Sequence, residues 1–410
     1  MRIRYIVSFV VGLLLLVGCN PIEQQEGNIE FQPIVLTKSQ QAVVAQGDAF
    51  ALDFLRVTSQ QIPDSNLFLS PMSASMLCCM LANGAEGETY AEIVKAIGMD
   101  GFTIDQVNDC YGSLVGSLLQ ADRSVSLSLA NSIWAANGLD VLSSFKRQMS
   151  WIYLADTYVV DFGQSATLKR INDWCSEKTK GLIPKMFDEL DAQVQMILIN
   201  ALYFKAKWKI QFSKDQTVAG PFTTVEGKQT QADFMFASSD AFTGYQDETV
   251  SVLRMPYGNG AFEMEAIMPN GKDFSGFLKA LTPERLAAWD GNNTTKTIDV
   301  RFPKFKAEFD TEEQLVPIMQ KLGMVKAFSS TAAQFGKMSS TFLYISNMRQ
   351  KTYVSVDEEG TEAAAVTIAE MRKNGVSASS NTQMVFNRPF VYLIREKSTG
   401  AILFAGLKLK

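Results

Sequence analysis

The chain has 410 residues, of which 47% are hydrophobic and 20% charged, a composition typical of a globular protein with a large core. Its formal net charge is −5 and its 38 basic residues are scattered, so the sequence lacks the basic patch that nucleic-acid binding requires. The absence of histidine excludes Ser-His-Asp, Cys-His and HExxH sites. No local motif indicates a carboxylate pair or Ser-Lys chemistry, so we expect no catalytic residue, metal or cofactor.

The N-terminus has the features of an export signal. Arg2 and Arg4 precede an apolar run from Ile6 to Val17, which is too short for a membrane span. The run ends in Leu16-Val17-Gly18-Cys19, which resembles the lipobox of bacterial lipoproteins, where cleavage leaves the cysteine lipidated. An ordinary secretory signal is the alternative. Because Asn20 is not Asp, the resemblance favours the outer membrane over retention in the inner one, with the face of the membrane left open.

The remaining chain is expected to form a tether and one domain. Residues 1–18 are predicted to be the lipoprotein signal peptide. Residues 19–44 are predicted to hold the lipidated Cys19 and a flexible tether, since Pro21 and the polar residues after it show little apolar periodicity. No linker or repeat follows, so residues 45–410 are expected to form a single domain, and a monomer.

The first half of the chain is rich in helical signals. Ser70-Pro71 predicts a helix start with a serine cap and proline in the first turn, and Gly84 ends the apolar run that follows. Cys78 and Cys79 are adjacent on this buried helix, an arrangement that disfavours a mutual disulfide. Cys110 and Cys175 could pair in an oxidising compartment, and the spacing leaves that question open.

Strand signals are concentrated later. The run Ile197–Phe204 is apolar at successive positions, as expected of a strand covered on both faces. Two more buried strands are predicted near the C-terminus, one from Val385 to Ile394 and one at Ile402–Phe404. The predicted fold class is α+β.

Residues 358–370 show a period of two. Small uncharged residues fall on one parity, whereas charged and larger residues fall on the other, so one face could be buried in a sheet. The small face consists of Thr361, Ala363, Ala365, Thr367 and Ala369, and the opposite parity holds Glu362, Val366, Ile368 and Glu370. Composition alone also permits an alanine-rich surface helix. Residues 371–381 are loop-like.

Asp357–Ala365 resembles the hinge of the inhibitory serpins, which would comprise Glu358, Gly360, Thr361, Glu362, Ala363, Ala364 and Ala365. Further similarities lie at Asn66–Ser73, Asn200–Trp208, Arg254–Tyr257, Pro303–Phe305, Lys321–Met324, Phe386–Phe390 and Leu403–Gly406. The resemblance implies three β-sheets with eight or nine helices and an exposed reactive-centre loop. It also implies a metastable inhibitor, not an enzyme, which traps a protease as an acyl-enzyme by inserting its cleaved loop into the central sheet.

The resemblance places the bond cleaved by the protease near Asn374. Family spacing from the hinge glycine predicts Asn374-Gly375, whereas Arg372 and Lys373 suit the acidic pocket of a trypsin-like protease, so we favour Lys373-Asn374 and then Arg372-Lys373. Met371 would suit elastase-like or chymotrypsin-like enzymes, and papain-like targets also remain open. The two basic residues could instead be solvated surface charges.

The resemblance also implies a gate in the sheet, at Ser70, Ser73, Asn200, Trp208 and Gln350. Gln350 stands where the family usually has histidine, so its amide would have to replace the imidazole hydrogen bond.

Residues 103–123, which resemble the family's heparin-binding helix, contain Arg123 as their one basic residue, so activation by heparin is not expected.

Two rival functions remain: a serpin-fold protein that binds a ligand without trapping proteases, and a carboxylate-dependent hydrolase.

Overall fold

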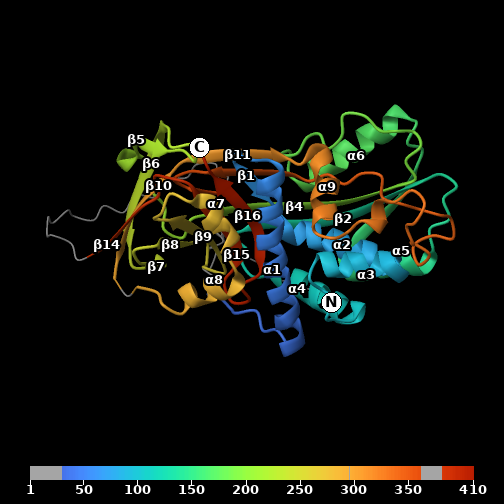
Figure 1. Ribbon diagram of the computed structural model, residues 1–410, viewed down its shortest axis with the longest axis horizontal. Helices are drawn as coiled ribbons and strands as arrows, with labels where there is room; N and C mark the ends of the chain where they lie inside the picture. The colour runs from blue at the N-terminus through green and yellow to red at the C-terminus, as the bar shows by residue number, and fades with distance from the viewer. Residues whose placement is uncertain (1–29, 295, 362–380) are drawn as a thin grey trace, which may run out of the picture.

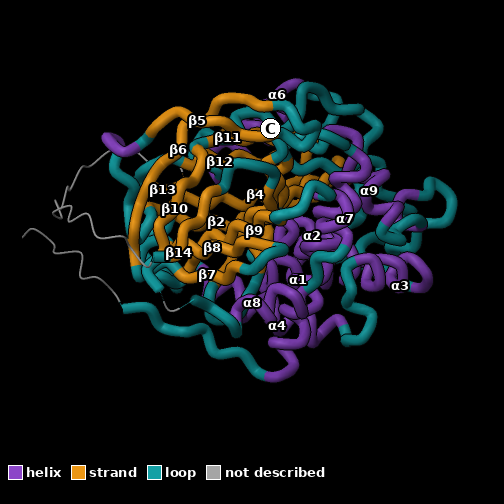
Figure 2. Tube along the Cα trace, turned by 60° about the vertical axis from the view of Figure 1, so that its left-hand side comes forward, coloured by secondary structure: helices purple, strands orange, loops and turns teal. Residues whose placement is uncertain are grey.

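The computed structural model describes residues 30–294, 296–361 and 381–410. Within them the chain forms nine α-helices and three β-sheets. The strands gather on one side of the molecule and most helices on the other (Figures 1 and 2). No helix in the described ranges is both long and apolar enough to span a bilayer.

Sheet A runs along the molecule and has six strands in the order β11-β12-β13-β4-β2-β3. They are β2 (Ser126–Ala136), β3 (Ala155–Val160), β4 (Met196–Lys207), β11 (Phe305–Asp310), β12 (Lys351–Val356) and β13 (Gly360–Thr361). The strand β13 is two residues long and lies between the much longer β12 and β4. Among the described strands, β13 alone joins the two halves of sheet A.

Sheet B packs beneath sheet A, and sheet C lies at one end of the molecule (Figure 1). Sheet B has the order β1-β16-β15-β9-β8-β7, formed by Leu67–Leu69, Ile402–Lys408, Phe390–Glu396, Phe262–Pro269, Val250–Pro256 and Thr243–Gln246. Sheet C has the order β14-β10-β6-β5, formed by Thr382–Val385, Ile298–Pro303, Gln229–Ser239 and Val218–Thr223.

The helices cover the sheets and fill the opposite end. They are α1 (Lys38–Gln61), α2 (Pro71–Gly84), α3 (Gly87–Ala96), α4 (Ile104–Leu118), α5 (Ser143–Tyr153), α6 (Ser165–Lys178), α7 (Phe274–Lys279), α8 (Pro283–Asp290) and α9 (Leu315–Lys321). Helix α6 packs on β2 and β4, whereas α2 contacts β4 from the other side of sheet A and also contacts β16 of sheet B. The space between the two six-stranded sheets is therefore partly filled by a helix.

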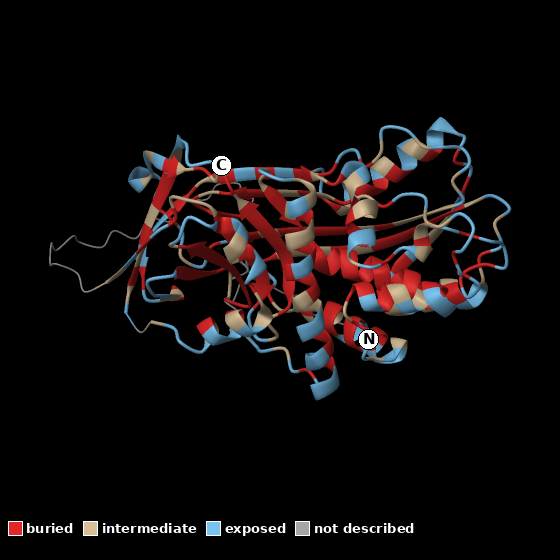
Figure 3. Ribbon diagram, viewed as in Figure 1, coloured by how far each residue is buried: buried red, intermediate tan, exposed pale blue. Residues whose placement is uncertain are grey.

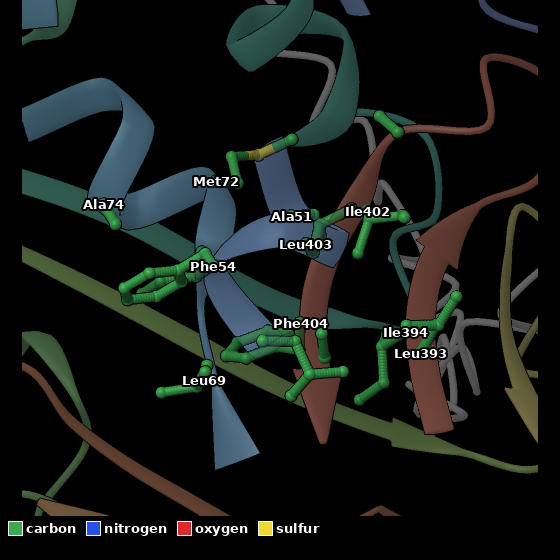
Figure 4. Close-up of a cluster of buried hydrophobic side chains, with 14 of the residues drawn as sticks. Ala51, Phe54, Leu69, Met72, Ala74, Leu393, Ile394, Ile402, Leu403 and Phe404 are labelled. Atoms are coloured by element: carbon green, nitrogen blue, oxygen red, sulfur yellow. The ribbon is translucent and has the colours of Figure 1, made fainter. Parts of the chain in front are cut away.

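Helix α2 is the centre of the core. All 14 of its residues are buried, and it appears red along its whole length in Figure 3. Ser70 caps it by accepting a hydrogen bond from the Ser73 amide, with Pro71 in the first turn, which confirms the helix predicted from Ser70-Pro71. Figure 4 shows Met72 and Ala74 of this helix in a cluster of buried hydrophobic side chains that also contains Phe54 of α1 and Phe404 of β16.

Two predicted boundaries need correction. The predicted tether ended at residue 44, but α1 already begins at Lys38, because Thr37 and Gln40 form a capping box and Val43 and Val44 are buried. The predicted strand from Val385 to Ile394 is two strands: Val385 ends β14 in sheet C, and β15 in sheet B begins at Phe390. Pro389, which cannot donate to a strand ladder, lies between them.

The four cysteines in the described residues are free and buried. Burial raises the pKa of the Cys78 and Cys110 thiols to about 12. Cys110 and Cys175 belong to different apolar clusters, so the pairing left open by the sequence is not formed in this structure.

Candidate functional site

The described part of the predicted hinge, Glu358–Thr361, makes a tight turn at the end of β12. The Asp357 amide donates to the Gly360 carbonyl oxygen at 3.1 Å, and the Asp357 carboxylate accepts from the Glu359 amide at 2.9 Å. The turn reverses the chain, so β13 runs antiparallel to both neighbours, with Thr361 opposite Val356 of β12 and Ala206 of β4. The hinge therefore enters sheet A instead of leaving it.

Gly360 makes this entry possible because its backbone lies against β4. It is paired with Lys207, and a Cβ added to it would stand 2.1 Å from the carbonyl oxygen of Ala206. Real Cβ atoms do not approach a backbone oxygen so closely, so a side chain here would force the two strands apart.

Thr361 and three aromatic side chains form the floor of the site. The Thr361 side chain is buried, and its hydroxyl lies 2.6 Å from the Tyr257 hydroxyl. Tyr257 is stacked on Trp208, with ring centroids 4.4 Å apart, and meets Phe204 edge-on. The Trp208 indole N–H donates to the Asp357 carbonyl oxygen at 2.8 Å, and its amide donates to the Glu359 carbonyl oxygen at 2.9 Å.

Two ion pairs hold the acidic residues of the turn. Glu358 accepts hydrogen bonds from Lys304 Nζ at 2.9 Å and from the Thr217 hydroxyl at 2.8 Å. Burial acts to raise the pKa of Glu358, but these two hydrogen bonds, a backbone hydrogen bond and the charge of Lys304 together hold the pKa below its ordinary value. Lys214 Nζ donates a hydrogen bond to the Glu359 carboxylate at 2.7 Å, and this hydrogen bond raises the pKa of the lysine.

Four of the five predicted gate residues meet at the N-terminal end of α2, whereas the fifth, Trp208, lies at the hinge turn. The Gln350 side chain makes two hydrogen bonds to one residue: its Oε1 accepts from the Ser70 amide at 3.0 Å, and its Nε2 donates to the Ser70 carbonyl oxygen at 2.9 Å. Ser73 donates its hydroxyl to Asn200 Oδ1, and Asn200 Nδ2 donates to Asn131 Oδ1 at 2.6 Å. The β12 half of sheet A is thus held to α2 through Gln350, and the β4 half through Asn200.

A narrow cavity, with room for about one water molecule, lies between β4 and β12. We call it the β4–β12 cavity; it is lined by Leu202, Tyr203, Phe204, Tyr353 and Phe404, with Thr179, Leu182 and Ile183 above the sheet. Successive residues of a strand point to opposite faces, yet Tyr203 and its two neighbours all line it. The cavity therefore lies in the plane of sheet A.

The structure brings together some of the predicted site residues and leaves others undescribed. Glu358, Gly360, Thr361 and Trp208 lie at the turn, whereas Ser70, Ser73, Asn200 and Gln350 lie further down sheet A. Outside the described residues lie Cys19, the hinge residues Glu362, Ala363, Ala364 and Ala365, and the bond candidates Met371, Arg372, Lys373, Asn374 and Gly375.

The residues with direct contacts at the site that were not predicted include Asn131, Lys214, Thr217, Tyr257 and Lys304. Tyr257 and Lys304 lie in the segments Arg254–Tyr257 and Pro303–Phe305, which the resemblance already singled out, and that was the available signal. The sequence around Asn131, Lys214 and Thr217 offered no comparable signal.

The chain is similar to known proteins along most of its length. The family model described as Serpin (serine protease inhibitor) matches residues 45–409. Human serpin B8 is 31% identical over 366 residues, covering 87% of this chain and 96% of the relative. The leukocyte elastase inhibitor of Bos taurus is 31% identical over 378 residues, covering 88% and 97%. The native-state crystal structure of tengpin, a thermophilic serpin, superposes with a TM-score of 0.82 at 29% identity, covering 93% and 97%.

Proposed function

This chain belongs to the serpin family, and on that premise we propose that it is an irreversible suicide-substrate inhibitor of proteases. The target cleaves the reactive loop and becomes covalently attached to it, and the freed hinge then inserts into sheet A before the acyl-enzyme is hydrolysed. The attached protease is carried to the opposite end of the molecule and distorted. The chain itself would supply no catalytic group and need no cofactor.

The observation that carries this proposal is the position of β13. Gly360 and Thr361 already pair with β4 and β12, as the first two residues of a strand between them. Below them the two long strands are separated by the β4–β12 cavity. A cleaved loop could therefore extend an existing strand and would not need to start a new one.

Continuing the register of β13 gives the loop a buried face that matches its small residues. Thr361 stands opposite Ala206, so each step of two along the loop moves two residues back along antiparallel β4. Ala363 would then stand opposite Phe204, whose side chain lines the β4–β12 cavity. Thr361 faces the interior, so Ala363 would too, because alternate residues share a face.

The same register brings Thr367 to the gate. It would stand opposite Asn200 on β4 and Gln350 on β12, the two residues that hold the halves of sheet A to α2. Opening the gate is then the step at which insertion must replace or share these hydrogen bonds.

The size and energy of the movement are adequate for the proposed mechanism. An extended stretch from Gly360 to Asn374 spans on the order of 45 Å at about 3.3 Å per residue, which is a domain diameter. A new central strand adds backbone hydrogen bonds worth roughly 1 kcal/mol each, plus apolar burial, so about 10 kcal/mol is available. That driving force favours completing the insertion over returning the loop to solvent.

We propose a trypsin-like serine protease as the favoured target, cleaving at Lys373-Asn374 or Arg372-Lys373, because an acidic specificity pocket binds a basic side chain. Elastase-like and papain-like enzymes are the alternatives. We also propose that Cys19 is lipidated and anchors the monomeric domain to the cell envelope, at the outer membrane. The Leu16–Cys19 motif supports this.

The decisive experiment incubates the purified protein with trypsin-like, elastase-like and papain-like proteases. We expect a complex with one of them that survives SDS, together with a released C-terminal peptide whose mass identifies the cleaved bond. Cleavage at any of the candidate bonds without a surviving complex would favour the rival function, a serpin-fold protein that binds a ligand. Anchoring is tested separately: Cys19→Ala should release the protein from membranes and leave complex formation unchanged.

A further inference from the structure

We infer that Tyr257 is a positioning residue whose hydroxyl latches Thr361 in sheet A before any cleavage. The effect of this Tyr257–Thr361 contact on protease inhibition rests on the proposed function. The two hydroxyl oxygens are 2.6 Å apart, and both side chains are buried. Thr361 is also the last described residue before the loop, and therefore the residue from which insertion would continue.

The Tyr257 ring is held by contacts that do not involve Thr361. Its ring is stacked on Trp208 and packs edge-on against Phe204, and its amide donates to the Phe262 carbonyl oxygen at 2.8 Å. Burial raises the pKa of Tyr257 far above its ordinary value, so the phenol stays protonated across the physiological range. These contacts fix the ring from which the hydroxyl reaches Thr361.

The pair makes hinge docking depend on matched hydroxyl groups. When both are present, the two buried hydroxyl groups satisfy each other. When one is removed, the docked state leaves the other buried without a partner, which costs more than a net hydrogen bond gains. When both are removed, two apolar groups of the same shape are left in contact, and the penalty disappears.

This latch differs in position from the two ion pairs of the turn. Glu358 and Glu359 hold the chain before it enters the sheet, and both of their lysine partners keep part of their side chains exposed. Tyr257 acts on the first residue that has turned to face the interior. It therefore stabilises β13 and raises the fraction of molecules in which insertion starts from a strand already in place.

The test compares Tyr257→Phe, Thr361→Val and the double variant with the parent protein. The readout is hydrogen exchange at the amides of Trp208 and Phe212, whose acceptors are the carbonyl oxygens of Glu359 and Glu358. We expect exchange there to accelerate on the order of tenfold in each single variant and to return towards the parent rate in the double variant. Hydrogen exchange needs no protease, so it tests whether the Tyr257–Thr361 contact stabilises the docked hinge even if the protein proves not to be an inhibitor.

Tyr392→Phe is the matched control. Tyr392 is also fully buried, and its hydroxyl donates to the Leu67 carbonyl oxygen at 3.1 Å in sheet B, so removing this hydroxyl should affect unfolding but not hydrogen exchange at the hinge.

A second measurement applies where a protease complex forms. More molecules of each single variant than of the parent protein should then be consumed for each protease molecule inhibited, and the double variant should behave like the parent. Equal hinge exchange in all four proteins, or a double variant worse than either single one, would overturn the latch.

Discussion

Lys304 Nζ and the Glu358 carboxylate lie 2.9 Å apart, joining the junction of β10 and β11 to the turn from which β13 enters sheet A. The Glu358 side chain is only 5% exposed, so its charge depends on this partner and on Thr217. A carboxylate held in this way contributes stability only while it is ionised. The hinge turn is therefore expected to weaken in acid.

The first prediction concerns that acid sensitivity. The folded-state pKa of Glu358 is lowered, so its contribution is fully present above the ordinary pKa of a glutamate and is lost as the pH falls through the lower folded value. We expect Glu358→Gln to unfold more easily in urea than the parent at pH 7, by about 1–2 kcal/mol, and this difference to shrink between pH 5 and pH 3. Glu226→Gln, a change at an exposed ion pair, is the control and should have little effect at either pH. A difference in unfolding free energy between Glu358→Gln and the parent that does not change with pH would contradict the prediction.

The second prediction concerns Gly360. Its Cβ would overlap the Ala206 carbonyl oxygen, so Gly360→Ala should expel β13 from sheet A and speed hydrogen exchange in the turn. We expect more inhibitor to be consumed per protease, because insertion must begin from an undocked hinge. Gly271→Ala is a suitable control, since a Cβ there meets no atom within 4 Å. Unchanged exchange in Gly360→Ala would show that β4 moves to accept the methyl group.

Local features of the fold and the site could be predicted from the sequence, whereas contacts between distant residues could not. Ser70-Pro71 is a local signal, with the cap, the proline and the apolar run within one helix, so α2 was predicted with its correct ends. The Tyr257–Thr361 contact joins residues 104 positions apart, and no periodicity reports which buried hydroxyl meets which. The split at Pro389 was missed because the apolar pattern continues through it, whereas the choice of sheet depends on distant partners.

The third prediction concerns the gate. The Gln350 amide both accepts from and donates to Ser70, and it does so at any pH. A neutral histidine could make the same two contacts, but its protonated form has only donors, so the Ser70 amide would lose its acceptor. We expect Gln350→His to behave like the parent at pH 8 and to lose stability relative to it as the pH falls below about 6.5.

The measurement for the gate is the difference in urea unfolding free energy between Gln350→His and the parent from pH 8 to pH 5. The parent has no histidine, so a change in this difference belongs to the new side chain. Protonation is disfavoured in the folded state, so stability is lost on the acid side, with a slope that cannot exceed about 1.4 kcal/mol per pH unit. A difference that stays constant would mean that the gate relaxes to accept a second donor.

The fourth prediction concerns Thr361, which faces the interior beside Tyr257 and is 2% exposed. Thr361→Arg would place an unpaired charge at the first position of the inserting strand, at a cost of several kcal/mol. We expect this variant to be cleaved by the target protease as a substrate, with no complex surviving SDS. The cleaved form should also lack the rise in melting temperature that insertion would give the parent.

The matched control for Thr361→Arg is Glu362→Arg, one residue further along the chain and on the opposite parity. In the extended register that residue faces away from the interior, so its arginine would stay in solvent and the variant should still trap the protease. Loss of trapping in both variants would mean that the loop tolerates no added positive charge on either face. Trapping by Thr361→Arg at the parent yield would mean that Thr361 need not enter sheet A, and the insertion mechanism proposed for this chain would fail.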